Sequence, residues 1–272
     1  MKARQATVII PTTGDRGDLL RFSVASVRNQ TVQDFEVHII GDGVSSAARD
    51  VIAELTRDDS RIFFHDFPKH ERRGEPYRHQ VIKHSSGRNI FYLCDRDLML
   101  PNHIETLCAL LRNYNFASTS HINVGKDKRL TINQQVGYFG PGSQVEARSR
   151  LVGNLSCVAH SREMYDRLAF GWRTTPIGKA TDIHMWEQFI AHPACRTFSS
   201  PRPTVMYFKR GDHPGDPVEE RARELAFWSE IISTHQGIDD VFWTALGGLM
   251  LERRELARFR TSVIKDRQES KP

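Results

Sequence analysis

The sequence predicts an α/β fold in which helices flank a central, mostly parallel β-sheet, followed by a helical extension at the carboxy terminus. Three observations support this prediction. Short apolar runs of strand length alternate with stretches of helical periodicity through residue 115, and this alternation is typical of βαβ units. The rhythm then changes to paired, strand-like runs at residues 116–124 and 130–138. From residue 217 onward the pattern is helical.

Strands of the first half are predicted where apolar runs are bounded by turn residues, at residues 7–10, 35–40, 61–64 and 90–94. We expect the second strand to break at Gly41-Asp42-Gly43. Helices are expected to begin at residues that favour a first helical turn, namely Asp18, Ser45 or Ser46, and Pro76. Gly87 is expected to end the third helix.

The second half is predicted to open with a helix at residues 102–113. Four further apolar runs predict strands, at residues 116–124, 130–138, 155–159 and 205–208. Ser161 is expected to cap a short helix, and residues 182–191 are expected to form a longer one. We therefore predict one domain over residues 1–216, with halves at 1–115 and 116–216, and an extension at 217–272.

The composition is that of an ordinary soluble globular protein, with 39% hydrophobic and 26% charged residues. The chain enters a strand within a few residues and has no membrane-length apolar run, so neither a secretory signal nor a membrane span is expected. The four cysteines lie far apart in the sequence, which favours reduced thiols and a cytoplasmic location. The net charge of +5 suits polyanionic partners. No nucleic-acid recognition motif accompanies the basic residues, so nucleic acid is not an expected partner.

The apolar run at residues 90–94 ends at two carboxylates, Asp95 and Asp97, separated by one residue. Ligands of open α/β sheets bind just beyond the carboxyl ends of the strands, and alternate carboxylates there can converge on one hard divalent cation. The alternative is that Asp97 only begins a turn. The next helix has its own start signal in Pro101-Asn102 with Glu105, so we favour the metal site.

Three loops at strand ends are expected to meet at one edge of the sheet, at residues 11–17, 41–43 and 95–97. In order and spacing they resemble the family 2 glycosyltransferases of GT-A fold. Val8-Ile9-Ile10-Pro11-Thr12 is similar to the family's first strand and nucleotide loop, and Asp95-Arg96-Asp97 stands where the family has its Asp-x-Asp motif. Two positions depart from the pattern: Gly41 replaces a first aspartate, and His79 replaces an asparagine. The resemblance covers about residues 6–210.

This resemblance implies a metal-dependent, inverting transferase of polysaccharide or glycoconjugate biosynthesis. It would move a sugar from a nucleoside-diphosphate donor, with uridine preferred as the nucleoside, to a hydroxyl of a glycan or glycoconjugate acceptor. Mn²⁺ or Mg²⁺ is the implied cofactor. Residues 1–216 would then form the GT-A catalytic domain, with residues 1–115 binding the nucleotide and residues 116–216 binding the acceptor.

The nucleotide-binding residues implied by the resemblance lie in these loops and in the segment after the third strand: Pro11, Thr12, Thr13, Arg16, Asp42, Arg73, Arg78 and Asp95. Asp42 would accept the imide hydrogen of uracil, whereas its alternative role is that of an ordinary turn residue. Arg73 or Arg78 would hold the diphosphate in bidentate geometry. A solvated helix face is an equal alternative for either arginine.

The metal would be held by Asp97, with Asp95 sharing it or holding the ribose. Bridging the diphosphate, the metal would stabilise the charge on the departing nucleotide. His213 follows the last strand and, like late histidines of several GT-A enzymes, would supply a further metal ligand. A solvent-exposed turn histidine is the alternative.

The general base implied by the resemblance is Asp182, at the start of a predicted helix, where a helix cap is a compatible second role. His184 and Glu187 are the alternatives for this base. Acceptor contacts are assigned to Trp172, His184 and Trp186, with Tyr138 as a further aromatic residue, because a sugar's C–H face suits an aromatic ring. Each aromatic side chain is equally compatible with the core, which we favour for Trp186.

Two rival functions are weighed against the transferase. A sugar-nucleotide pyrophosphorylase needs a Gly-Thr-Arg core in its first loop, which residues 11–16 lack. A catalytically inactive nucleotide-sugar binding module would not need Asp95, Asp97 and Asp182 together. The sequence therefore favours the transferase.

The extension combines apolar residues at helical spacing with many arginines. A basic amphipathic helix can lie on an anionic membrane surface, which would place the protein at the inner face of the membrane. The other outcomes are packing of the apolar stripe on the catalytic domain or on a second subunit in a homodimer. We favour packing.

Overall fold

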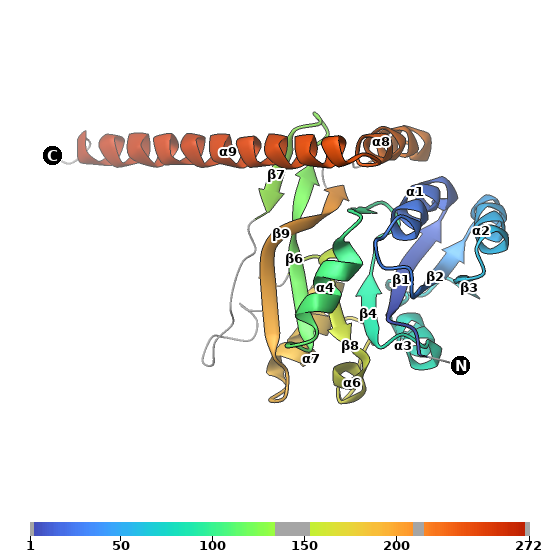
Figure 1. Ribbon diagram of the computed structural model, residues 1–272. Coiled ribbons are helices and arrows are strands. Elements are labelled where there is room, and N and C mark those ends of the chain that lie inside the picture. Colours follow the sequence, from blue (N-terminus) through green and yellow to red (C-terminus); the bar gives the residue numbers. More distant parts are fainter. Residues whose placement is uncertain (1–2, 134–152, 209–214, 270–272) are drawn as a thin grey trace.

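The computed structural model describes residues 3–133, 153–208 and 215–269. Within them one nine-stranded sheet has the order β3-β2-β1-β4-β8-β6-β9-β5, and β7 pairs with β6 (Figure 1). The elements run in the following order: β1 (Ala6–Gly14), α1 (Gly17–Arg28), β2 (Phe35–Val44), α2 (Ser46–Asp58), β3 (Ile62–Phe67), α3 (Glu75–His84), β4 (Asn89–Tyr92), β5 (Leu98–Met99), α4 (His103–Leu110), β6 (Phe116–Val124), β7 (Leu130–Asn133), η1 (Leu155–Cys157), β8 (Val158–Ser161), α6 (Arg162–Asp166), α7 (Thr181–Ala191), β9 (Thr197–Phe208), α8 (Val218–Ile231) and α9 (His235–Glu269).

The predicted α/β architecture is confirmed, and its parallel part is the first half of the sheet. Strand β1 pairs in parallel with β2 and β4, and β2 pairs in parallel with β3. In the second half, β6 and β9 are parallel, whereas β8 runs antiparallel to both β4 and β6. The carboxyl ends of β1, β2 and β4 therefore meet at one edge, as the βαβ pattern predicts.

Strand β2 is longer than the sequence predicts. The expected break at Gly41-Asp42-Gly43 is wrong, because β2 continues to Val44 while paired with β1 on one side and with β3 on the other. Gly43 has a left-handed φ of 65°, which glycine adopts without steric cost. Ladder hydrogen bonds on both sides thus extend the strand through residues whose local preference is a turn.

Several other element boundaries differ from the prediction. Helix α1 begins at Gly17, with Arg16 at the N-cap position and without a side-chain cap from Asp18. Strand β9 begins at Thr197 rather than near residue 205, and its register against β6 shifts around Pro203. Proline lacks the N–H that a strand residue donates. The sequence pattern therefore does not predict a strand over the proline-containing residues before 205. Ser45 and Ser161 do cap their helices, by accepting hydrogen bonds from the N–H groups of Ala48 and Met164.

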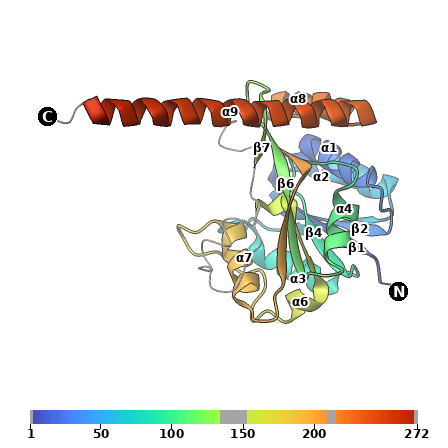
Figure 2. The same cartoon turned by 60° about the vertical axis from the view of Figure 1, so that its left-hand side comes forward.

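Two layers of helices cover the sheet (Figure 2). Helices α1, α2 and α4 share one hydrophobic cluster with strands β1, β2 and β4, and helices α3, α6 and α7 share a second cluster that holds the aromatic core. Burial of these apolar faces is the main stabilising contribution. The loops left uncovered are those at the carboxyl ends of the parallel strands.

The helical extension packs on the sheet domain over part of its length. A third cluster joins Leu225 and Trp228 of α8 and Val241 of α9 to strands β6, β7 and β9. Beyond β7, helix α9 continues past the edge of the sheet (Figure 1), and its apolar side chains there are exposed: Met250 66% and Leu251 60%. Among the described helices, none has the length and apolarity that a membrane span requires.

This packing predicts different costs for two tryptophans of the extension. Trp228 is 5% exposed, whereas Trp243 is 65% exposed. We expect Trp228→Ala to lower the free energy of unfolding by about 3–5 kcal/mol, because it leaves a cavity in the third cluster. Trp243→Ala, the matched control, should change it by less than about 0.5 kcal/mol. Urea denaturation of both variants is the measurement. Equal, small effects would mean that α8 does not stabilise the domain.

Candidate active site

A cavity of about 600 Å³ lies at the edge where β1, β2 and β4 end. Most of the predicted site residues line it: Pro11, Thr12, Thr13, Arg16, Asp42, Arg73, Arg78, Asp95, Trp172 and Asp182. Its walls come from segments far apart in the sequence, because parallel strands deliver their loops to one edge. The start of α7 closes the side opposite β1.

The cavity wall carries more positive than negative charge. Six basic side chains line it (Arg16, Lys69, Arg72, Arg73, Arg78 and Arg96), against three acidic ones (Asp42, Asp95 and Asp182). A cleft lined by one sign of charge concentrates ligands of the opposite sign. Sequence reasoning did not single out Lys69, Arg72 or Arg96, although the first two lie in a visibly basic loop and Arg96 sits between the two aspartates.

Arg78 is a buried cation with unused hydrogen-bonding capacity. It is 5% exposed, its Nη2 donates to the carbonyl oxygen of Arg73 at 2.9 Å, and its guanidinium lies 4.8 Å from the centre of the Trp172 ring. Its Nε and Nη1 are buried and have no partner among the described residues. Burial lowers the pKa of Arg78. A buried guanidinium with two unpartnered nitrogen atoms in a cavity is suited to an anionic ligand.

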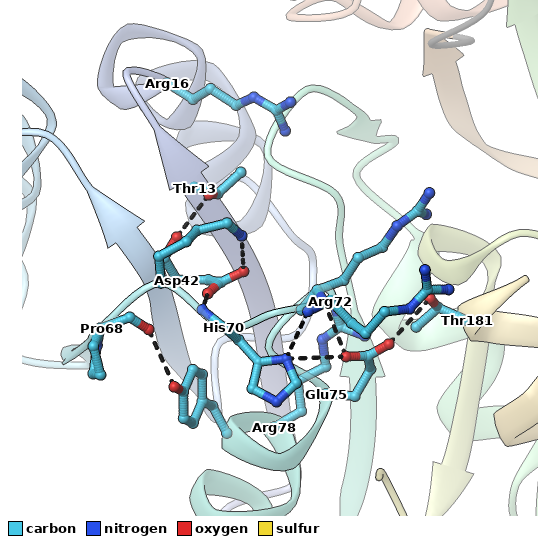
Figure 3. Close-up of polar contacts among 12 residues, drawn as sticks. Thr13, Arg16, Asp42, Pro68, His70, Arg72, Glu75, Arg78 and Thr181 are labelled. Carbon is cyan, nitrogen blue, oxygen red and sulfur yellow. Dashed lines mark hydrogen bonds and ion pairs between the residues drawn. The ribbon is translucent and has the colours of Figure 1, made fainter. Parts of the chain in front are cut away.

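Glu75 ties the basic loop to the start of α7. Its carboxylate is fully buried and accepts hydrogen bonds from Arg73 N at 3.1 Å, from Thr175 N at 3.4 Å and from Thr181 Oγ1 at 3.4 Å (Figure 3). Burial opposes the charge, yet these hydrogen bonds and the Arg78 cation lower the pKa of Glu75 overall. The segment that carries Arg73 is thereby held against the helix that carries Asp182.

Asp182 lies in the first turn of α7 and faces the cavity. Burial raises the pKa of its carboxyl group, although the N–H of Ile183, 2.9 Å from Oδ1, and the cations Arg78 and Arg73 oppose the shift. A carboxylate whose pKa is raised towards neutrality is better matched to accept a proton during catalysis. Asp182 is therefore a cavity-lining carboxyl group with a raised pKa.

Asp42 is held by the loop that follows β3. Its two carboxylate oxygens accept hydrogen bonds from His70 N at 2.5 Å and from Lys69 Nζ at 2.5 Å, and Thr13 Oγ1 donates to its carbonyl oxygen at 2.6 Å (Figure 3). The Lys69 side chain is 56% exposed, so it is free to leave without unpacking the core. Asp42 is thus placed at the wall as predicted, with its carboxylate turned to the loop.

The two aspartates of Asp95-Arg96-Asp97 have different surroundings. Asp95 lines the cavity and accepts hydrogen bonds from Thr12 Oγ1 at 3.0 Å and from Arg16 Nη1 at 3.2 Å. Asp97 is fully buried and is not part of the cavity wall. Its oxygens accept from Ser156 Oγ at 2.5 Å and from Phe208 N at 3.2 Å. Burial raises the pKa of Asp97 to about 6, and the charge of Asp95 adds to this shift.

This pair suits a hard cation in its chemistry. Carboxylate oxygens are the ligands that Mg²⁺ and Mn²⁺ prefer, and the mutual repulsion of Asp95 and Asp97 would be relieved by a divalent charge between them. No cluster of three His, Cys, Asp or Glu side chains suited to a metal occurs in the part of the chain that the structure describes. The other ligands would have to come from the donor diphosphate and water.

Besides Asp97, several predicted residues do not reach the cavity or cannot be placed. Trp186 is fully buried against Tyr92, Phe116 and Phe189, so its assignment to the acceptor is wrong: it is a core residue. His184 is buried and does not line the cavity, and its Nδ1 lies 3.8 Å from Glu187 Oε2. His213 and Tyr138 lie outside the described residues.

Fold and site together have the features of the GT-A fold: a mostly parallel sheet whose strand ends carry a cavity lined by basic and acidic side chains. The family model of glycosyl transferase family 2 matches residues 7–171. The chain therefore belongs to that family.

Relatives with curated names match shorter segments. An uncharacterized glycosyltransferase of Rickettsia bellii is 28% identical over 141 residues, which are 51% of this chain and 20% of that protein. A GalNAc(5)-diNAcBac-PP-undecaprenol beta-1,3-glucosyltransferase of Campylobacter jejuni is 28% identical over 101 residues, 37% of this chain and 32% of that protein. The matched segments thus span a third or less of these relatives' lengths.

Solved structures share the fold at low sequence identity. Residues 1–349 of S. aureus TarS in complex with UDP-GlcNAc superpose with a TM-score of 0.59 at 14% identity, over 85% of this chain and 67% of that one. The mannosyltransferase PcManGT of Pyrobaculum calidifontis, in complex with GDP-Man and Mn²⁺, gives a TM-score of 0.55 at 14% identity, over 91% of this chain and 69% of that one.

Arg78 provides a test of whether the cavity is built for an anion. We expect Arg78→Met to lower the melting temperature but to keep the fold, because methionine retains a long side chain against Trp172 while the buried Glu75 carboxylate loses a neighbouring cation. The same variant should bind UDP at least roughly tenfold more weakly, since a charge-assisted hydrogen bond contributes about 1.5–3 kcal/mol. Thermal melts with and without UDP measure both. A large loss of stability with unchanged UDP binding would make Arg78 a structural residue.

Proposed function

We propose that the protein is an inverting glycosyltransferase that moves a sugar from a nucleoside-diphosphate donor to a hydroxyl of a glycan or glycoconjugate acceptor. The observation that carries this proposal is the pairing, in one cavity, of the buried and partly unpartnered Arg78 with Asp182. The cation is suited to the diphosphate, and the carboxylate is suited to accept a proton. Family membership supports the reaction class.

The donor is held in this proposal by residues of the first half of the chain. Asp42 binds the base of the nucleotide at the end of β2, with uracil preferred through the resemblance of the sequence to the family. Arg78, Arg73 and Arg16 bind the diphosphate oxygens, where guanidinium groups match the geometry of the anion. Two structural neighbours bind UDP-GlcNAc and GDP-Man, which supports a nucleotide-sugar donor.

The divalent metal would be held by Asp95 and Asp97, with Mn²⁺ or Mg²⁺ as the cation. When bound, it would supply positive charge that stabilises the departing nucleoside diphosphate. Asp97 holds its place through Ser156 and Phe208 N, and Arg16 neutralises part of the charge of Asp95. The arginines of the cavity wall contribute in the same direction, since they favour negative charge on the leaving group.

Asp182 acts as the general base. It accepts the proton of the acceptor hydroxyl as the oxygen attacks the anomeric carbon, on the side of the sugar opposite the diphosphate, so that the configuration inverts. Glu75 holds Thr181 and Arg73 and so keeps base and donor at a constant separation. A binding module without turnover would not need Asp182, so activity that depends on this residue separates the two functions.

The location we propose is the cytoplasm. All four cysteines are free thiols, which agrees with a reducing compartment. The Campylobacter relative is named for an undecaprenol-linked substrate, and a lipid-linked glycoconjugate acceptor would bring this enzyme to the inner face of the membrane.

Replacement of Asp182 tests the base. We expect Asp182→Asn to bind UDP normally and to lose transfer by a factor on the order of a hundred to ten thousand. Transfer to a glycan panel from UDP-sugars and binding by calorimetry are the two measurements. His184→Ala and Glu187→Gln are the controls and should retain activity. Transfer at the wild-type rate by Asp182→Asn would reject this residue as the base.

The pH profile of the wild type should follow from the same residue. Burial raises the pKa of Asp182, and only the carboxylate accepts a proton. The value of kcat/KM should therefore fall as the pH drops through the pKa of Asp182, which lies above the value of about 3.9 of an ordinary aspartate. The residual activity of Asp182→Asn should lack this acidic limb. An acidic limb that survives in the variant would belong to another group.

Replacement of Asp97 tests the metal. We choose Asp97→Asn because the amide retains an oxygen that can accept from Phe208 N and so preserves the buried contact. Wild-type protein should bind UDP more tightly with Mn²⁺ than with a chelator. The variant should lose that difference. Its affinity for UDP in Mn²⁺ should fall by more than the roughly 10- to 100-fold that loss of an outer-shell partner costs. Calorimetry is the measurement. Wild-type affinity that ignores the chelator would contradict metal dependence.

A further inference from the structure

Beside the donor cavity lies a second cavity of about 480 Å³, on one face of strands β9, β6 and β7. The two share a wall, since Asn154 and Tyr207 line both. The rest of the second cavity is built from side chains of the β6–β7 hairpin and from Glu252 of α9. The two cavities are therefore neighbours that Asn154 and Tyr207 separate.

Strand pairing explains why this face of the hairpin is polar. Asn123 is the partner of Tyr207 on one side and of Thr131 on the other, and His121 is the partner of Asn133. Because side chains alternate across a sheet, these five lie on one face. The other face, with Ile122, Val124, Leu130 and Ile132, is buried in the cluster under α8 and α9. A strand with one apolar core face ordinarily leaves its polar face to solvent, but here that face lines a cavity.

The polar groups of this face are only partly used within the protein. His121 Nε2 lies 3.1 Å from Asn123 Oδ1, and Asn123 Nδ2 donates weakly to Thr131 Oγ1 at 3.5 Å. Both side-chain polar atoms of Asn154 are buried without a hydrogen-bond partner among the described residues. An unpartnered buried amide at the junction of two cavities is costly unless a ligand uses it.

We propose that this second cavity is the acceptor site and that it binds a neutral oligosaccharide chain. Amides and hydroxyls match the alternating donors and acceptors of sugar hydroxyls, and the Tyr207 ring, packed edge-on against His121 at 4.9 Å, offers an aromatic surface for a sugar face. Its charged residues are Asp127, Glu252 and Arg129, which leave no positive excess for an anionic chain. This inference rests on the proposed transferase function and replaces the acceptor role predicted for Trp186.

The shared wall gives the chain a route to the reacting atoms. Tyr207 lines both cavities, and Asp182 lines the donor cavity, so the proposed base shares one cavity with the residue that borders the second. The terminal sugar of the chain would pass Asn154 and Tyr207 to place its hydroxyl at Asp182, while the preceding sugars lie along Asn123 and Thr131. Helix α9 contributes Glu252 to the same site, which assigns the extension a part in acceptor binding.

The test uses the full chain, a glycan array that includes neutral pentasaccharides and acidic oligosaccharides, and UDP in solution. Wild-type protein should bind neutral chains. The double variant Asn123→Ala/Asn133→Ala should bind them at least roughly tenfold more weakly, because two hydrogen-bonding amides are lost. The matched control is Asn113→Ala, an exposed asparagine outside both cavities. Calorimetry should show unchanged UDP affinity in all variants.

Each result decides the proposal. Neutral-chain binding that survives the double variant, binding of acidic chains alone, or no glycan binding by the wild type would overturn it. Glu252→Ala, at an exposed position on α9, repeats the test without risk to the sheet and should weaken glycan binding with an unchanged melting temperature. Absence of UDP binding by the wild type would instead reject the proposed function, so the two failures are distinguishable.

Discussion

The buried carboxylate of Asp97 is the contact on which the geometry of the site depends. It follows β4 in the first half of the chain and accepts hydrogen bonds from Ser156 and from the backbone of Phe208 in the second half. Ser23 Oγ of α1 in turn donates to the carbonyl oxygen of Asp97 at 3.0 Å. A desolvated charge tolerates little displacement of its partners. This residue therefore links the two halves of the chain beside the cavity.

A second buried carboxylate, Glu75, plays the corresponding part on the opposite wall. It joins the backbone of the basic loop to Thr181 at the start of α7, while Nε and Nη1 of the neighbouring Arg78 have no partner among the described residues. The backbone of this wall is thus held in place by hydrogen bonds, whereas the Arg78 cation lacks hydrogen-bond partners for part of its guanidinium group. Such an arrangement sacrifices stability in the free protein and recovers it when an anion binds. The excess of basic over acidic side chains in the cavity wall is also a cost to stability that an anionic ligand would relieve.

The carboxy-terminal helices connect this site to the outer surface. Trp228 and Val241 bury their side chains against β6, β7 and β9 and so hold the hairpin whose polar face lines the second cavity. The apolar face of that hairpin fixes its position, and the polar face is thereby presented towards Tyr207. Packing of the extension and the proposed acceptor site are two consequences of one alternation of side chains along β6 and β7.

The sequence alone determined the βαβ half, the edge at which its loops meet and the residue types along that edge, because periodicity and the strand-end rule depend only on local order. Tertiary contacts decided the rest. Pairing on both sides carried β2 through Gly41-Asp42-Gly43, and contact with the aromatic core made Trp186 a packing residue. Asp97 became a buried link instead of a cavity-wall residue because Ser156 and Phe208, distant in sequence, bind its carboxylate. The burial of a side chain and the identity of its hydrogen-bond partners depend on residues far apart in the chain, so they cannot be predicted from a local sequence pattern.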